Sequence, residues 1–361
     1  MTSLLKRLRD TPPLMKRTVF ILFSFWVLAA ALVACSSPSI LPSPAANPTA
    51  SLQALPPPTS TPAPTPTSSP ELAVLIPDPA HPEWTEPVLA ALQEFTAPAG
   101  LALETTPRLD PAQLPSRLRL VVSLVSLPDL PALLAAAPQA QFLVVTDQPL
   151  DPAANLTVLH LNPEAQMFVA GLASTLLSDD WRAAGLIPAE TPTLQEAFVN
   201  GGRYFCGECA PGWPLGFNFP LAGGPQAAQD GPAWQAVAAS FFDQGKVDVF
   251  FLSPEATRPE VLAYLNGLAQ LNTPVRLVGT LPPPPEIQSQ WALSVSFDLP
   301  SALRQALPEL LGGKSAGQLT APIDLTHINP DLFTPGRERL VRTIMQQVIS
   351  GQISPLSVPV E

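Results

Sequence analysis

Short, nearly continuous apolar runs recur along the chain from Glu71 onward, and amphipathic stretches separate them. Runs of this kind suit strands that are buried on both faces of a parallel sheet. The expected strands are Leu72–Ile76, Leu118–Leu124, Gln141–Val145, Leu156–Leu161, Ala183–Ile187, Val247–Leu252, Val275–Val278 and Trp291–Ser296. The expected helices are Pro87–Phe95, Glu164–Leu177, Ala233–Gln244, Pro259–Leu271 and Ser301–Leu311.

This alternation predicts βαβ units and a doubly wound α/β architecture with parallel sheets. The part from Glu71 to Glu361 has about 290 residues, more than one ordinary open sheet requires, so we expect two lobes. Ligands of open α/β sheets bind beyond the carboxyl ends of the strands. The loops that follow the strands are therefore where a site is expected.

The N-terminal residues have the layout of a secretion signal. A basic stretch at 6–17 precedes an uncharged apolar run at 18–34. The sequence LVAC at 32–35 resembles the lipobox of bacterial lipoproteins, whose cysteine thiol takes a diacylglyceryl group. The alternative is an uncleaved transmembrane helix, although the run is at the short end of the roughly 17–25 residues that a span requires. We expect residues 1–34 to be a signal peptide and Cys35 to anchor the protein on the extracytoplasmic face of the cell membrane.

Residues 35–70 have the composition of a linker. From Ser36 to Pro70 there is no charged residue, and Pro, Ser, Thr and Ala dominate. Such a stretch cannot bury enough apolar surface to offset its chain entropy, so we expect it to be disordered. Its prolines favour polyproline II, which would make it a spacer between the membrane and a folded part.

The charge balance excludes some partners. Removal of residues 1–34 takes away five of the 18 Lys and Arg and one of the 29 Asp and Glu. That leaves 13 against 28, a formal net charge of −15. An acidic surface repels phosphate backbones, so nucleic acid is not expected as a partner.

Cys206 and Cys209, in the sequence FCGEC, are the cysteines that remain once Cys35 is acylated. Such a pair can be a thioredoxin-type redox pair or half of a zinc site. Zinc would need two more ligands, and the three histidines show no ligand spacing. A redox pair usually opens a helix, whereas this pair is in a Gly- and Pro-rich stretch that we expect to be a loop. In an oxidising compartment we therefore expect a structural disulfide, and no metal or cofactor.

Four parts of the chain, in order, carry a resemblance to a known family. They are Pro138–Asp147 (PQAQFLVVTD), Asn162–Ser174 (NPEAQMFVAGLAS), Phe242–Phe251 (FDQGKVDVFF), and a C-terminal set made of Leu310–Lys314, Ile323–Leu325 and Arg337–Ile353. These segments resemble motifs of the basic membrane protein family, also called the PnrA-like family, of substrate-binding lipoproteins. The matches cover most of the chain after the linker.

The resemblance implies a type I periplasmic-binding-protein fold, in which two Rossmann-like lobes joined by three crossovers close on a ligand. The expected lobes are residues 71–180 with about 281–322, and residues 181–280 with about 323–361. In the family the ligand is often a purine nucleoside that is handed to an ABC permease. A base would stack on aromatic rings, and carboxylates would accept hydrogen bonds from ribose hydroxyls.

Carried over by position, the resemblance gives a set of candidate ligand-binding residues. Asp78 corresponds to an early acidic residue of the family, Trp84 to a stacking Phe, and Asp147 to an Asp at a strand end. Phe217 or Phe219 would supply a second ring. The alternatives are structural: an Asp at a strand end often caps a helix, and the aromatic residues could belong to the core.

Two positions depart from the family. Thr280 and Leu281 stand where the family has an Asp, and Phe297 or a neighbour stands where it has a Lys. Both departures remove polar groups that would contact a ribose, so they count against nucleoside binding of the usual kind.

Motifs of common enzymes do not occur in the sequence: it has no G-x-S-x-G, H-E-x-x-H, P-loop or G-x-G-x-x-G behind a strand. We expect a binding protein rather than an enzyme, specifically the solute receptor of an ABC importer. One alternative is a membrane-tethered sensor or envelope scaffold with a degenerate pocket and no transport role. A hydrolase of the cell envelope is a second alternative.

Overall fold

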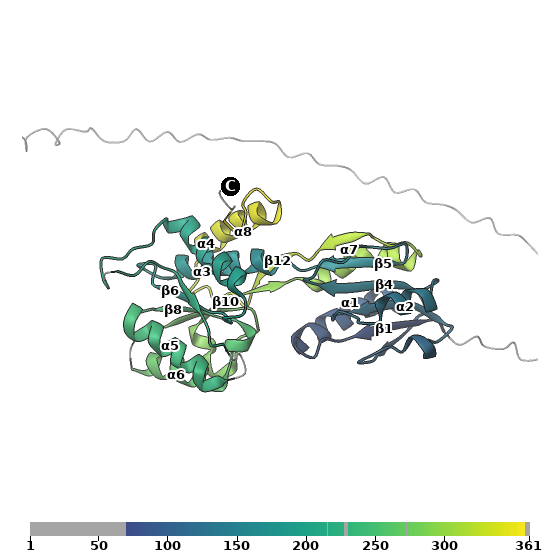
Figure 1. Ribbon diagram of the computed structural model, residues 1–361, viewed down its shortest axis with the longest axis horizontal. Coiled ribbons are helices and arrows are strands. Elements are labelled where there is room, and N and C mark those ends of the chain that lie inside the picture. The colour runs from purple at the N-terminus through teal and green to yellow at the C-terminus, as the bar shows by residue number, and fades with distance from the viewer. Residues whose placement is uncertain (1–69, 215, 227–229, 272, 274, 358–361) are drawn as a thin grey trace, which may run out of the picture. The chain divides into compact units, whose positions relative to one another are not determined.

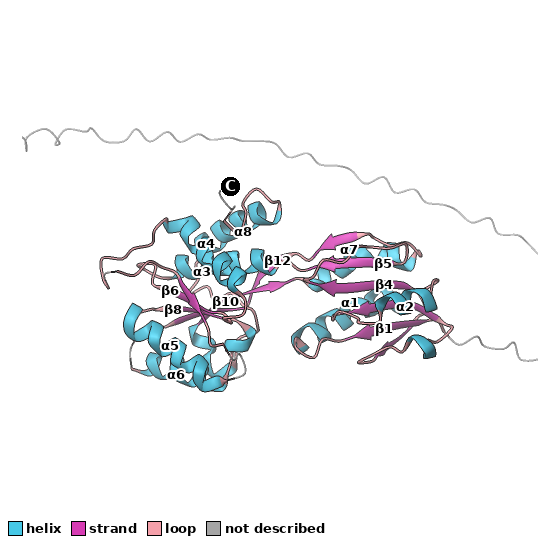
Figure 2. Cartoon of the chain, viewed as in Figure 1, coloured by secondary structure: helices cyan, strands magenta, loops and turns pink. Residues whose placement is uncertain are grey.

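The computed structural model describes residues 70–214, 216–226, 230–271, 273 and 275–357. The expected signal peptide (1–34), Cys35 and all of the linker except Pro70 lie outside the described residues. Within them, helices and strands alternate along the chain (Figure 2). No helix in this part is long and apolar enough to cross a membrane.

The first sheet has six parallel strands in the order β11-β5-β4-β3-β1-β2. Alternate residues of its strands point to opposite faces, as a pleated strand requires. On one face, Ala73 and Leu75 pack with α1 and α7; on the other, Val74 and Ile76 pack with α2. The elements are β1 (Leu72–Ile76), α1 (Thr85–Thr96), β2 (Ala102–Thr105), β3 (Leu118–Ser123), α2 (Leu130–Ala136), β4 (Gln141–Thr146), β5 (Leu156–His160), α7 (Leu299–Leu311) and β11 (Gln318–Thr320).

The second sheet has the order β12-β10-β9-β8-β6-β7, and only β12 runs antiparallel to its neighbour. Helices α5 and α6 cover one face of this sheet, and α3, α4 and α8 cover the other (Figure 1). The elements are α3 (Pro163–Leu177), β6 (Ala183–Leu186), α4 (Pro192–Cys206), β7 (Leu221–Gly223), α5 (Gly231–Gly245), β8 (Val249–Leu252), α6 (Pro259–Gln270), β9 (Arg276–Gly279), β10 (Trp291–Phe297), β12 (Ile323–Thr326) and α8 (Pro335–Ile349).

The lobes are divided at other positions than we expected. Helix α3 packs in the core of the second sheet, and β10 pairs with β9 of that sheet, although both were expected in the first lobe. The first lobe is therefore 71–161 with 298–321, and the second is 162–297 with 322–357. The sequence did not show this because 13 of the 15 residues of α3 are buried, so no single apolar stripe marks its partner.

Helices α3 and α4 approach each other closely through two glycines. A Cβ on Gly171 would overlap the backbone oxygen of Phe198, and one on Gly201 would overlap that of Phe168. The glycine of the segment that resembles the family motif at 162–174 thus has a packing role.

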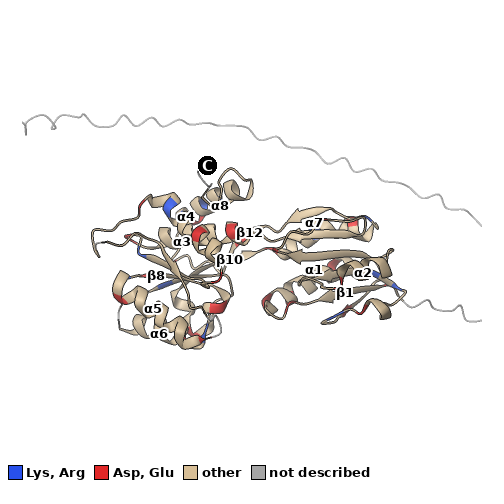
Figure 3. Cartoon of the chain, viewed as in Figure 1, with Lys and Arg blue, Asp and Glu red and all other residues tan. Residues whose placement is uncertain are grey.

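Charged residues are sparse and scattered along the folded part (Figure 3). They make up 13% of the whole chain. Several form ion pairs near the surface, such as the exposed pair of Arg304 with Glu94 and the half-buried pair of Arg342 with Asp324. Pairs of this kind contribute little to stability in water.

Candidate functional site

A cavity of about 350 Å³ lies at the carboxyl ends of the strands. Its lining comes from the segments after β1, β3, β4 and β5 of the first sheet and after β6, β8 and β9 of the second. The end of β10 and the first turn of α3 complete it. This is the location that the rule for open α/β sheets predicts.

The segment after β1 presents two stacked rings to the cavity. Asp78 accepts a hydrogen bond from Ala80 N at 2.8 Å and turns the chain, and Pro82 then begins the short 3-10 helix Pro82–Trp84. Residues three apart eclipse one another in a 3-10 helix. The rings of His81 and Trp84 accordingly stack, with centroids 4.1 Å apart and 11° between their planes.

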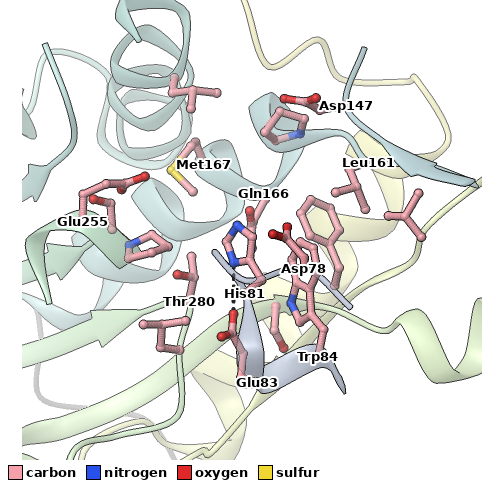
Figure 4. Close-up of a pocket in the computed structure, with 18 of the residues that line it drawn as sticks. Asp78, His81, Glu83, Trp84, Asp147, Leu161, Gln166, Met167, Glu255 and Thr280 are labelled. Atoms are coloured by element: carbon pink, nitrogen blue, oxygen red, sulfur yellow. Dashed lines mark hydrogen bonds and ion pairs between the residues drawn. The ribbon is translucent and has the colours of Figure 1, made fainter. Parts of the chain in front are cut away.

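His81 lies among carboxylates. Its Nδ1 is 3.0 Å from Glu83 Oε1 (Figure 4). Burial of the ring lowers the pKa of His81, but the hydrogen bond to Glu83 and the negative charges of Glu83, Asp78 and Glu255 outweigh it, so the pKa is raised overall. The imidazole therefore gains a proton at a higher pH than an ordinary histidine does.

Helix α3 begins at the cavity because Asn162 caps it. The Asn162 side chain accepts a hydrogen bond from Ala165 N at 2.8 Å, and Pro163 occupies the first helical position. The first turn then brings Gln166 and Met167 to the cavity. Gln166 donates from Nε2 to the backbone oxygen of Val295 at 2.8 Å.

The second sheet contributes the loops after β8 and β9. Ser253 accepts a hydrogen bond from Ala256 N at 3.4 Å and so begins the turn that carries Glu255. Thr280 directly follows β9, and its buried Oγ1 has no hydrogen-bond partner within the described residues. Both Glu255 and Thr280 line the cavity.

Three of the five expected ligand-binding residues, Asp78, Trp84 and Asp147, line this one cavity. Phe217 and Phe219 are not among its lining residues. Phe219 is fully buried in the core under α5 and α6, and Phe217 packs against that core. The alternative that these two rings belong to the core is therefore the one that the structure supports. Their Gly- and Pro-rich stretch leads into the edge strand β7 and not to a strand end at the cavity.

Sequence reasoning missed His81, Gln166 and Glu255 as lining residues. Gln166 lies inside the 162–174 segment, and Glu255 follows an expected strand. Both positions are therefore in segments that follow strands, where ligands of open α/β sheets bind. The departures from the family also line the cavity: Thr280 and Leu281 after β9, and Phe297 at the end of β10.

Cys206 and Cys209 form a disulfide, as expected. The expectation that both lie in a loop was wrong for Cys206, which is the last residue of α4. The bond closes the turn after that helix. Neither cysteine lines the cavity.

Solved structures share this architecture at low sequence identity. An ABC transporter solute-binding protein from Conexibacter woesei has a TM-score of 0.55 at 14% identity, over 81% of this chain and 99% of that chain. One from Aeropyrum pernix has a TM-score of 0.53 at 13% identity, over 81% and 94%. A transcriptional activator from Bacillus halodurans has a TM-score of 0.51 at 11% identity, over 78% and 99%.

These likenesses show the fold. The chain has two α/β lobes in a type I periplasmic-binding-protein-like arrangement, which confirms the expected fold class. No protein-family model and no curated protein sequence matches the chain.

Proposed function

We propose that this chain is an extracytoplasmic solute-binding protein that delivers a small molecule to an ABC permease. The observation that carries the proposal is the cavity of about 350 Å³, lined by strand-end residues of both sheets. A concave site with aromatic faces and a few polar groups is the usual form of a small-molecule site. Two of the structures with similar folds are solute-binding proteins of ABC transporters, which supports the same role here.

The ligand in this proposal binds between the lobes. Closure of the lobes around it would present the closed form to the permease. Three connections, near 161–162, at 298 and near 321–322, link the lobes. Asp298 N donates to the backbone oxygen of Pro322 at 2.8 Å, so two of these connections are joined by a hydrogen bond.

Nucleosides are the first ligand class to test, because the resemblance to the basic membrane protein family names them. Trp84 offers an aromatic face, and the carboxylates of Asp78 and Asp147 can accept hydrogen bonds from hydroxyls. No catalytic step is part of the proposal.

Calorimetry on the full chain in mild detergent measures ligand binding and so tests the proposed receptor function. Adenosine, guanosine and inosine are tested first, and sugars, amino acids and amines follow. A ligand at a hundred times its Kd should stabilise the fold by about 2.7 kcal/mol. If no small molecule of these classes binds at millimolar concentration, the proposal that the chain is a solute receptor is contradicted. A membrane-tethered sensor or scaffold with a degenerate pocket would then be the better account.

The anchor is tested separately. Lipidation of Cys35 would keep the protein in the membrane fraction of its bacterium, and Cys35→Ala should release it or leave it unprocessed. Mass spectrometry of the mature N-terminus gives the direct measurement. An unmodified Cys35 in a membrane-bound chain would contradict the lipoprotein assignment.

A further inference from the structure

The ionisable side chains of the cavity are almost all acidic. Asp78, Glu83, Asp147 and Glu255 line it together with one histidine, His81. No Lys or Arg is among the described residues of the lining. Since only 13% of the chain is charged, four carboxylates on one small cavity are a local concentration.

Two of these carboxylates form no hydrogen bond or ion pair within the described part of the chain, although the charge of Glu255 acts on His81. Glu83 is engaged with His81, and Asp78 accepts from Ala80 N. The side chains of Asp147 and Glu255 make no hydrogen bond or ion pair with any described residue. They come from different lobes, after β4 and after β8, and Figure 4 shows them on different sides of the drawn site.

Gln166 adds a neutral acceptor. Its side chain is buried, with 7% of the residue exposed, and Nε2 donates to Val295 O. A carbonyl oxygen only accepts, so this contact fixes which end of the amide is nitrogen. Oε1 is left without a partner among the described residues. This atom is not among the fully buried unpartnered ones, so it is open to a ligand or to water in the cavity.

Several hydroxyl groups nearby are already engaged, but Thr280 Oγ1 has no partner among the described residues. Thr146 Oγ1 accepts from Gln148 N at 3.0 Å, and the hydroxyls of Ser296 and Thr326 are 3.1 Å apart. Of the polar atoms left free, Thr280 Oγ1 can donate or accept, whereas the carboxylates of Asp147 and Glu255 and the Oε1 of Gln166 accept, so a ligand that brings donors matches most of them. The stacked His81 and Trp84 rings and Phe297 add aromatic surface, on which a cation is also favoured.

We propose that the solute is an organic cation, a protonated or quaternary amine with an apolar or aromatic body. This deepens the proposed receptor function and rests on it. A positive ligand would neutralise the unpartnered carboxylates of Asp147 and Glu255, whereas an anion would add to their repulsion. A metal ion is a poorer occupant, because no group of three or more His, Cys, Asp or Glu in the described residues is arranged to hold one.

Calorimetry with matched ligands tests the proposal on the full chain. The first set shares a phenyl body: phenethylamine (cation), 2-phenylethanol (neutral) and phenylacetate (anion). The second pair is choline and its neutral analogue 3,3-dimethyl-1-butanol. We expect at least one of the two cations to bind about tenfold or more tighter than its neutral partner, a difference of about 1.4 kcal/mol, and phenylacetate not to bind.

Two substitutions assign the effect to the cavity. Asp147→Asn and Glu255→Gln should each weaken cation binding about tenfold while leaving binding of the neutral partner unchanged. Glu309→Gln, an exposed carboxylate on α7 outside the cavity, is the matched control and should change neither.

The outcomes separate this proposal from the one on which it rests. Binding of nucleosides or sugars without any preference for the cations overturns the cationic ligand and leaves the receptor standing. Cation binding that Asp147→Asn and Glu255→Gln do not change overturns the assignment to this cavity. Failure of every ligand class overturns both proposals.

Discussion

Gln166 and Val295 are joined by a hydrogen bond of 2.8 Å from the side-chain Nε2 to the backbone oxygen. The contact ties the first turn of α3 to β10, the strand that precedes a crossover between the lobes. It also leaves Oε1 as an acceptor without a partner among the described residues, so one end of the amide stabilises the fold and the other end is available to the cavity.

Replacement of this side chain separates the two roles. Gln166→Met keeps the length of the side chain and removes both polar atoms. We expect phenethylamine affinity to fall about tenfold and the free energy of unfolding to fall by about 1 kcal/mol, the net value of one hydrogen bond. Calorimetry and chemical denaturation measure the two quantities.

The control loses a similar bond away from the cavity. Asn155 donates from Nδ2 to Ala140 O at 3.3 Å, and neither residue lines the cavity. Asn155→Ala should lower the free energy of unfolding and leave phenethylamine affinity unchanged. Equal ligand affinity in Gln166→Met and the unmodified protein would show that Oε1 does not contact the solute.

The close approach of α3 and α4 gives a prediction about stability. Alanine at Gly171 or Gly201 would place a methyl group on a backbone oxygen that cannot rotate away. We expect each variant to lose about 3 kcal/mol of unfolding free energy or to fail to fold. Gly267→Ala in α6 is the control, because its Cβ would meet open space, and it should gain about 0.5–1 kcal/mol from the better helix former. If Gly171→Ala melted at the same temperature as the unmodified protein, the close packing of α3 against α4 would be disproved.

The same glycines show where the sequence was a poor guide. Strands such as β1 and β4 were predictable because their residues are buried on both faces and so form continuous apolar runs. Helix α4 was not, since Gly201 and Gly202 lower its intrinsic propensity and packing against α3 overrides that cost. The edge strands β2 and β11 are short and partly exposed, so they carry no apolar run.

Much of the site was predictable for a related reason. Asp78, Trp84 and Asp147 follow strands whose ends could be read from the sequence, and they meet because the carboxyl ends of parallel strands share one edge. Phe217 and Phe219 follow no such strand. Gln166 and Glu255 required knowledge of which side of a helix or turn faces the cavity, and that is set by tertiary packing.

Asp248 gives a prediction about the pH dependence of stability. Burial raises the pKa of its carboxyl, although the hydrogen bond from Ser178 Oγ at 2.7 Å and the charge of Arg182 oppose this. Because the folded pKa exceeds the unfolded value of about 4, the folded state binds the proton more tightly. The group therefore favours folding most at low pH, and its contribution declines as pH rises from the unfolded pKa through the folded one.

Asp248→Asn keeps an oxygen for Ser178 and removes the buried charge. Its melting temperature should exceed that of the unmodified protein above this window, with the difference shrinking as pH falls to about 3.5. Thermal melts from about pH 3.5 to 7 measure the difference, and Glu309→Gln should show none. A difference that grows toward low pH would contradict the assignment.

His81 makes binding of a cationic solute sensitive to pH. The groups facing it are Glu83 at 3.0 Å, Trp84 on its ring face, and the carboxylates of Asp78 and Glu255. Their net effect, against the opposing effect of burial, raises the pKa of His81 above its ordinary value. Between about pH 8 and 6, a range that spans the ordinary histidine pKa of about 6.5, the ring is therefore more protonated at each pH than a free histidine, and its protonation increases as pH falls. A charged imidazolium beside the solute repels it and offsets part of the negative charge of the cavity's carboxylates. Phenethylamine affinity should therefore fall over this range, by a few-fold to about tenfold.

The neutral ligand separates this effect from a general loss of structure. Binding of 2-phenylethanol should not change between about pH 8 and 6, and His81→Gln should remove the pH dependence for phenethylamine while keeping its affinity at the higher pH. Calorimetry at three pH values on both proteins measures it. An unchanged pH dependence in His81→Gln would assign the titration to another group and remove His81 from the contact with the solute.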